Sequence, residues 1–129
     1  MPILVGLDLT PVPRVAEVLE RFRERFLARI FVEGEIQHRR RHPRAFAEHV
    51  AGRFAAKEAA MKALGTGWRG VAFREIAIRR SASGKPVLEL TGRAAARARV
   101  LGVVESEVSI THTADLAAAV VVLVTRGTS

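Results

Sequence analysis

The stretch from Pro43 to Gly67, PRAFAEHVAGRFAAKEAAMKALGTG, carries the longest helical pattern in the chain. Proline is favoured in the first turn of a helix, and Gly65-Thr66-Gly67 supplies residues that commonly end one. The sequence therefore predicts a helix from Arg44 to about Leu64. The apolar stripe of this helix consists of side chains at helical spacing, namely Phe46, Val50, Phe54, Met61 and Leu64.

Three charged residues of this predicted helix lie on or beside its apolar stripe. On a helical wheel Lys57 falls inside the apolar arc. Glu58 lies about 40° from Phe54, and Lys62 lies a similar step further round. A buried charge needs a partner, or else its pKa shifts. Two interpretations are open: a structural i,i+4 ion pair between Glu58 and Lys62, or a functional cluster, since perturbed charges also mark active sites.

The start of the chain predicts a strand that ends in a carboxylate. Residues Pro2 to Leu9, PILVGLDL, form a nearly continuous apolar run, which is typical of a strand buried on both faces. Asp8 lies at the end of this run. It is either a capping residue for the next helix or a site group held on a rigid element.

An amphipathic helix is predicted from Pro13 to about Phe26. Beside its apolar stripe, Arg14, Arg21 and Arg25 fall within about 40° of one another on a helical wheel. We call these three residues the arginine row. The row is either a solvated flank of the helix or a surface that docks an acidic helix.

The remaining segments predict short elements. In chain order they are a short helix within Val32–Arg41, a hairpin of Val71–Arg79 and Pro86–Leu90, a helix at Gly92–Leu101, and a hairpin of Glu107–Thr113 and Leu116–Thr125. The turn of the first hairpin contains Gly84 and Lys85, which could receive a phosphate, although most such turns bind nothing. His112 ends a strand, where a single histidine is usually structural.

Length and composition indicate one globular domain. The chain has 129 residues, of which 49% are hydrophobic, so residues 1–129 can form one real core. The longest apolar run, Leu116 to Val124, has the length of a strand and is too short to span a bilayer. The chain has no cysteine, which excludes a disulfide scaffold and a cysteine-based zinc site. We expect a cytoplasmic protein without a membrane segment.

The basic charge points to an acidic partner. The formal net charge is +8, and 18 of the 21 basic residues are arginine. Three lysines are retained: Lys57, Lys62 and Lys85. They mark positions where the compact ammonium of lysine suits the chemistry better than the planar guanidinium of arginine. A small nucleic-acid-binding module is the alternative, but the seven aromatic residues leave little for base stacking.

Four motifs in register resemble the holo-[acyl-carrier-protein] synthases, which are small 4′-phosphopantetheinyl transferases. The most specific is RFAAKEA at residues 53–59, followed by KALGTG at 62–67. The others are GLDL at 6–9, GKP at 84–86 and SITH at 109–112. This resemblance, which covers nearly the whole chain, implies an α+β fold with a small antiparallel sheet packed against the long helix.

The resemblance also implies an activity. These enzymes move 4′-phosphopantetheine from coenzyme A to a serine of an apo acyl carrier protein, using Mg²⁺ and releasing adenosine 3′,5′-bisphosphate, in fatty acid or other synthesis. Asp8 and Glu58 resemble the metal ligands, and Lys62 is placed to act on the leaving phosphate. The residues that would line the coenzyme A site are Arg53, Lys62, Gly84, Lys85, Pro86, Thr111 and His112. Lys57 would orient Glu58.

Assembly and partner binding follow from the same resemblance. Family members form trimers with sites between subunits, and their carrier proteins are acidic, which suits the arginine row. Two positions depart from the family pattern. Pro11 and Pro13 stand where a polar, often acidic, residue is expected, so either a third carboxylate or a water completes the metal shell. Thr113 follows His112, so a base supplied from that position in some relatives is absent.

Overall fold

The predicted long helix is the central element of the structure, a computed structural model that describes residues 2–37 and 42–126. This helix, α2, spans Pro43–Leu64 and ends at Gly65, whose φ of 74° lies in the left-handed region. The other elements are β1 (Ile3–Pro11), α1 (Val12–Ile30), α3 (Gly67–Gly70), η1 (Phe73–Glu75), β2 (Ile76–Arg80), β3 (Pro86–Leu90), α4 (Gly92–Leu101), β4 (Val103–His112) and β5 (Leu116–Thr125).

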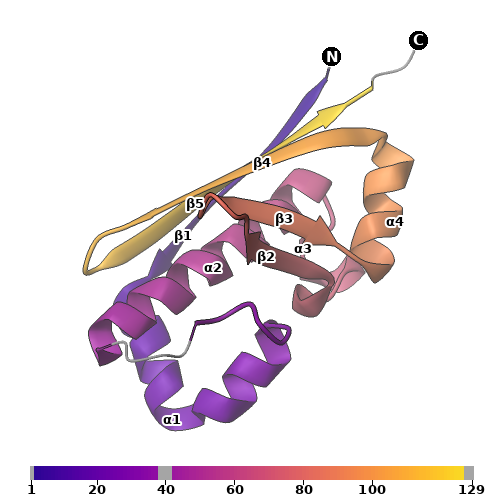
Figure 1. Cartoon of the computed structure of the whole chain (residues 1–129). Coiled ribbons are helices and arrows are strands. Elements are labelled where there is room, and N and C mark those ends of the chain that lie inside the picture. The colour runs from indigo at the N-terminus through magenta and orange to yellow at the C-terminus, as the bar shows by residue number, and fades with distance from the viewer. Residues whose placement is uncertain (1, 38–41, 127–129) are drawn as a thin grey trace.

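The strands form two antiparallel units, and β3 of the smaller unit lies against β4 of the larger one. Strands β1, β5 and β4 make a three-stranded sheet with β5 in the middle, and β2 and β3 make a separate hairpin. Helix α2 packs against one face of the larger sheet (Figure 1). The predicted α+β fold, a small antiparallel sheet on a long helix, is confirmed.

Two glycines allow α2 to lie close to the sheet. A Cβ on Gly6 of β1 would collide with the backbone oxygen of Ala59 and lie 2.8 Å from the Ala63 nitrogen. A Cβ on Gly52 of α2 would lie 2.8 Å from Cγ2 of Ile110 on β4. Side chains at these positions would push helix and sheet apart. The helix is therefore held at two crossing points, one on each edge strand.

The two faces of the larger sheet have different surroundings. Gly6, Asp8 and Thr10 are buried on the side that faces α2, which we call the helix face. The opposite side, the open face, carries Ile3, Val5, Leu7 and Leu9, each 57–59% exposed. The prediction that β1 is buried on both faces is wrong for the single chain, because α2 covers one side only.

Other predictions differ from the structure. The predicted strand Val71–Arg79 begins only at Ile76, because Phe73–Glu75 form the 3-10 helix η1. Helix α1 has non-helical dihedral angles at Phe22, where φ is −134° and ψ is 30°, so it is kinked between Arg21 and Arg25. Residues Val32–Gln37 form turns and contain no helix, because the buried Glu35 side chain ties this segment to β2. The rest of the predicted 32–41 helix lies outside the described residues. No helix in the described ranges combines the length and the apolarity needed to cross a membrane.

Candidate functional site

Asp8 is buried on the helix face of β1, and both of its carboxylate oxygens are held. The Thr10 hydroxyl donates to Oδ2 at 2.9 Å, and Lys62 Nζ donates to Oδ1 at 3.1 Å. The N-cap of α1 is Pro11, and no side chain makes a capping bond there. The capping interpretation of Asp8 is therefore wrong, and its carboxylate faces α2 instead.

Glu58 and Lys62 of α2 lie beside Asp8. Burial and the negative charge of Asp8 raise the pKa of the half-buried Glu58 carboxyl, while Lys62 opposes that rise. Lys62 Nζ also donates to the Leu7 carbonyl at 2.9 Å, so its ion pair is with Asp8 and not with Glu58. The structure thus brings together three of the predicted residues. We call Asp8, Glu58 and Lys62 the β1-edge cluster.

Lys57 does not orient Glu58, contrary to the prediction. It is fully buried, and its Nζ donates to Glu35 Oε1 at 2.9 Å, to the Phe73 carbonyl at 2.9 Å and to the Ile76 carbonyl at 2.6 Å. Desolvation lowers the pKa of Lys57, and the Glu35 charge works against that effect. Its three bonds match the three donors of an ammonium. Lys57 therefore joins α2 to the segments around it.

Glu35, the partner of Lys57, was missed by the sequence reasoning. Its Oε1 also accepts from the Val32 N–H, and its Oε2 accepts from the Ile78 N–H at 2.8 Å. The available signal was weak: Glu33 and Glu35 both lie in the apolar segment 30–36, IFVEGEI, and Glu33 is exposed. Periodicity does not tell which of two such acids is buried.

The remaining predicted coenzyme A residues gather at the other edge of the sheet. We call Arg53, Gly84, Lys85, Pro86, Thr111 and His112 the β4-edge cluster. Arg53 and His112 line a cavity of about 190 Å³ together with Glu48, His49 and Arg80. Lys85 and Pro86 line a neighbouring cavity of about 370 Å³, and Lys85 Nζ is paired with Glu107 of β4 at 2.6 Å.

Thr111 and His112 point to opposite faces of β4, because successive strand residues alternate. His112 pairs in register with the buried Ala117, and Thr111 pairs with Ala118. Thr111 is therefore exposed on the open face, while His112 is on the helix face beside Arg53. The members of the β4-edge cluster share one edge of the sheet without sharing one cavity.

Helix α2 separates the two clusters within one chain. Arg53 and Glu58 are five residues apart on α2, which places them about 140° apart around the helix axis. Asp8 is level with Ile110 across β5, since both pair with Ala119. Two strand spacings put those edge strands about 10 Å apart, with α2 packed over the sheet between them. One chain therefore holds the two clusters on opposite flanks of α2.

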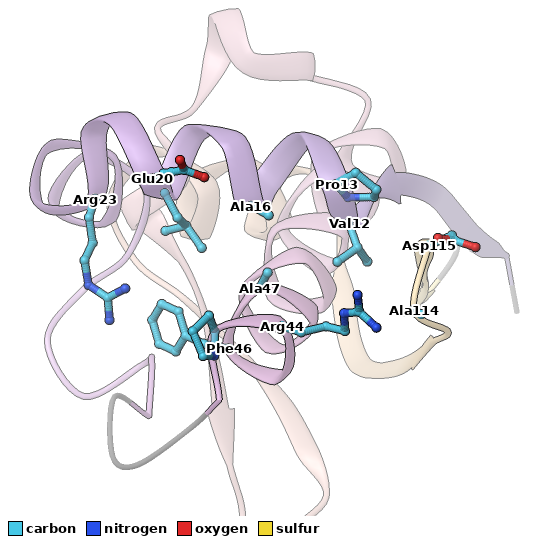
Figure 2. Close-up of a pocket in the computed structure, with 12 residues that line it drawn as sticks. Val12, Pro13, Ala16, Glu20, Arg23, Arg44, Phe46, Ala47, Ala114 and Asp115 are labelled. Atoms are coloured by element: carbon cyan, nitrogen blue, oxygen red, sulfur yellow. The ribbon is translucent and has the colours of Figure 1, made fainter.

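The arginine row is exposed on α1, although the kink at Phe22 sets Arg25 on a different helical segment from Arg14 and Arg21. A separate hollow of about 530 Å³ lies between α1, the start of α2 and the β4–β5 turn. Figure 2 shows this hollow. The Arg23 Cζ atom lies 4.3 Å from the centroid of the Phe46 ring. None of the predicted site residues lines it.

The donor set of the β1-edge cluster suits a hard divalent cation. Mg²⁺ is commonly held by one or two carboxylates together with water and substrate phosphate. Asp8 and Glu58 provide two carboxylates whose charges interact, as the raised pKa of Glu58 indicates. In the described part of the chain no group of three or more His, Cys, Asp or Glu could hold an ion.

Comparisons with known proteins agree on one family. A family model described as the 4′-phosphopantetheinyl transferase superfamily matches residues 4–121. The holo-[acyl-carrier-protein] synthase of Gloeobacter violaceus is 44% identical over 91% of this chain and 89% of its own. The Solidesulfovibrio magneticus protein of the same name is 49% identical over 92% and 95% of the two chains. A solved ACPS–CoA complex from Chronobacterium ammoniagenes superposes with a TM-score of 0.80 at 34% identity, covering 98% of this chain and all of that one.

Proposed function

This chain belongs to the holo-[acyl-carrier-protein] synthases of the 4′-phosphopantetheinyl transferase superfamily, and from that premise we propose how its residues share the reaction. It transfers phosphopantetheine from coenzyme A to an apo acyl carrier protein. We propose that residues 1–129 act as one domain in the cytoplasm, that the reaction serves fatty acid biosynthesis and needs Mg²⁺, and that adenosine 3′,5′-bisphosphate is released.

The β1-edge cluster is the proposed chemical half-site. The serine hydroxyl of the carrier protein loses its proton and its oxygen bonds to the phosphorus next to pantetheine. The bond from that phosphorus to the bridging oxygen breaks, and the bridging oxygen leaves with adenosine 3′,5′-bisphosphate. Lys62 lies at the rim of the cluster with a half-exposed side chain, and it neutralises or protonates the leaving phosphate. Asp8 and Glu58 would hold Mg²⁺, which supplies charge compensation to the phosphates when bound. Thr10 and Lys62 keep the Asp8 carboxylate in a fixed orientation.

The β4-edge cluster is the proposed binding half-site for coenzyme A. Arg53, Lys85 and His112 would contact phosphate groups of the substrate. Gly84 and Pro86 shape the turn that carries Lys85, and the φ of Gly84 is 88°. In the free chain Lys85 is paired with Glu107 at the surface, where an exposed ion pair costs little to exchange for a phosphate.

The observation that carries the proposed site is the separation of these two clusters by α2. If the β4 edge of one subunit lies beside the β1 edge of the next, each contact completes one site. Such a head-to-tail contact repeats until a ring closes. We propose a ring of three, in which the apolar open face of each sheet is covered, since an exposed apolar patch of this kind marks an interface.

The arginine row is the proposed contact for the acidic carrier protein. Helix α1 begins at Val12, directly after the strand that carries Asp8. A carrier protein on the exposed side of α1 would therefore approach the β1-edge cluster, where its serine must react. Arg14 and Arg21 lie before the kink and on the same segment. They are the better-supported pair of the three.

The test is conversion of a purified apo acyl carrier protein, followed by mass spectrometry. With the enzyme, coenzyme A and Mg²⁺ the carrier gains the mass of phosphopantetheine, and a chelator stops the gain until Mg²⁺ is restored. An unmodified carrier protein would indicate a relative that kept the fold and lost the chemistry. The nucleic-acid-binding alternative explains only the charge, and tighter binding of labelled RNA than of labelled coenzyme A would favour it.

A further inference from the structure

We propose that Glu48 is a positioning residue that holds the His112 ring in place for a phosphate of coenzyme A. Neither the sequence motifs nor the relatives' names assign a role to Glu48. The inference rests on the proposed function, in which His112 belongs to the coenzyme A half-site. It concerns the cavity of about 190 Å³ at the β4 edge.

The packing of α2 on β4 brings Glu48 and His112 together. Gly52 and Ile110 mark the crossing point of these elements, where a Cβ on Gly52 would meet Ile110 Cγ2 at 2.8 Å. Glu48 lies one helical turn before Gly52, a rise of about 6 Å. His112 lies two residues after Ile110 on the same strand face, an advance of about 6.6 Å. The two side chains therefore lie at matching levels.

The contact is a direct one between ring and carboxylate. His112 Nδ1 lies 3.0 Å from Glu48 Oε1, and Glu48 is the less exposed partner, with 20% of its side chain accessible against 44% for His112. A carboxylate acceptor at Nδ1 sets the orientation of the ring. The second nitrogen, Nε2, is left to act on a ligand.

The charges around this cavity explain why an acid is present in a site for a phosphate. Arg53 and Arg80 supply positive charge, and Glu48 is the acidic residue in the lining. His49, also in the lining, uses its Nε2 to accept from the Gln37 N–H. An unpaired carboxylate would repel a phosphate. Directed at Nδ1, the same carboxylate lets an imidazolium donate Nδ1–H to the protein and Nε2–H to the phosphate.

The test compares two Glu48 variants with the wild type and with His112→Ala. Glu48→Gln keeps an oxygen that can accept from Nδ1, whereas Glu48→Ala removes it. We expect Glu48→Ala to raise KM for coenzyme A about tenfold, the effect of losing one charge-assisted bond of roughly 1.5 kcal/mol. Glu48→Gln should stay within about threefold of wild type, and kcat and the KM for the carrier protein should change little in either variant.

A double-mutant cycle separates positioning from a purely structural role. If Glu48 acts through His112, adding Glu48→Ala to the His112→Ala enzyme has no further effect on KM for coenzyme A. If Glu48→Ala raises KM for coenzyme A by the same factor in the wild-type and in the His112→Ala enzyme, the proposal is overturned. A lower KM in Glu48→Ala would also overturn it, because this would mean that the acid merely repels phosphate. A wild-type enzyme that fails to modify the carrier protein would instead refute the proposed function.

Discussion

The two edges of the three-stranded sheet carry opposite chemistry. The β1 edge holds two acids and a lysine in close contact, with Asp8 buried and hydrogen-bonded at both oxygens. The β4 edge is mostly cationic, and its residues are spread over two cavities and a turn. Helix α2 contributes residues to both edges, and each of its two flanks faces one edge. In the proposed function this fold therefore separates chemistry from substrate binding, and each edge supplies half of a site.

The largest effect is expected from neutralising the acids of the β1-edge cluster. Asp8→Asn and Glu58→Gln should each leave the fold intact and lower kcat by a factor of 100 or more, since several kcal/mol of charge stabilisation is lost. Steady-state kinetics at limiting Mg²⁺ measures this, with circular dichroism as the control for folding. Near-normal turnover in either variant would remove that residue from the proposed metal pair.

The next effect tests whether the two edges meet across subunits. Glu58→Gln subunits keep an intact β4 edge, and Lys85→Ala subunits keep an intact β1 edge. Unfolded and refolded together in equal amounts, they should regain about a quarter of wild-type activity, because random assembly makes about one contact in four intact. Each variant refolded alone is the control. No recovery from a confirmed mixed trimer, or a monomer by light scattering, would contradict the shared site.

A smaller effect is expected when the lysine of the β1 edge becomes an arginine. Lys62→Arg preserves the charge and the binding of coenzyme A. The planar guanidinium of arginine cannot replace the compact ammonium of Lys62, which donates hydrogen bonds to Leu7 and Asp8. We expect kcat to fall about tenfold while KM for coenzyme A stays constant, a split read from initial rates. An unchanged kcat would reduce Lys62 to a general source of positive charge.

The smallest effect concerns the approach of the carrier protein to the β1 edge. Arg14→Glu or Arg21→Glu should raise KM for the carrier protein several-fold and leave KM for coenzyme A unchanged, because exposed charges steer encounter more than they bind. Added salt should reproduce the trend in the wild type, since screening acts over about 8 Å at physiological ionic strength. If KM for the carrier protein changes neither with these substitutions nor with added salt, this surface is excluded as the carrier-protein contact. Arg25→Glu, the same charge reversal beyond the kink, is the variant with which Arg14→Glu and Arg21→Glu are compared.

Sequence reasoning worked where local chemistry decides the structure. The bounds of α2 follow from Pro43 and Gly65. Glu58 and Lys62 were singled out by their positions beside an apolar arc, whereas their grouping with Asp8 came from the family resemblance. The hairpin that carries Gly84 and Lys85 was also predicted from its turn. In each case a few neighbouring residues contain the necessary information.

It failed where the decisive partner is far away in the chain. The carboxylate that satisfies Lys57 comes from Glu35, which is 22 residues earlier and lies in a turn. The exposed side of β1 could not be predicted either, because an apolar run does not say whether its cover comes from its own chain or from another copy. The kink at Phe22 falls within an otherwise regular pattern of apolar residues.

The position of β5 has a consequence for how this protein folds. It is the last strand along the chain and the middle strand of the sheet, paired with β1 through Ile3–Val124 and with β4 through Val103–Thr125. Until residues 116–125 emerge during synthesis, β1 and β4 have no strand between them, and α2 lacks its contacts with the middle of the sheet. Such late, long-range pairing slows folding and prolongs exposure of apolar surface. A chain that stops at residue 115 should therefore lack a cooperative thermal transition by circular dichroism, and a sharp transition would show that β5 is not needed to complete the core.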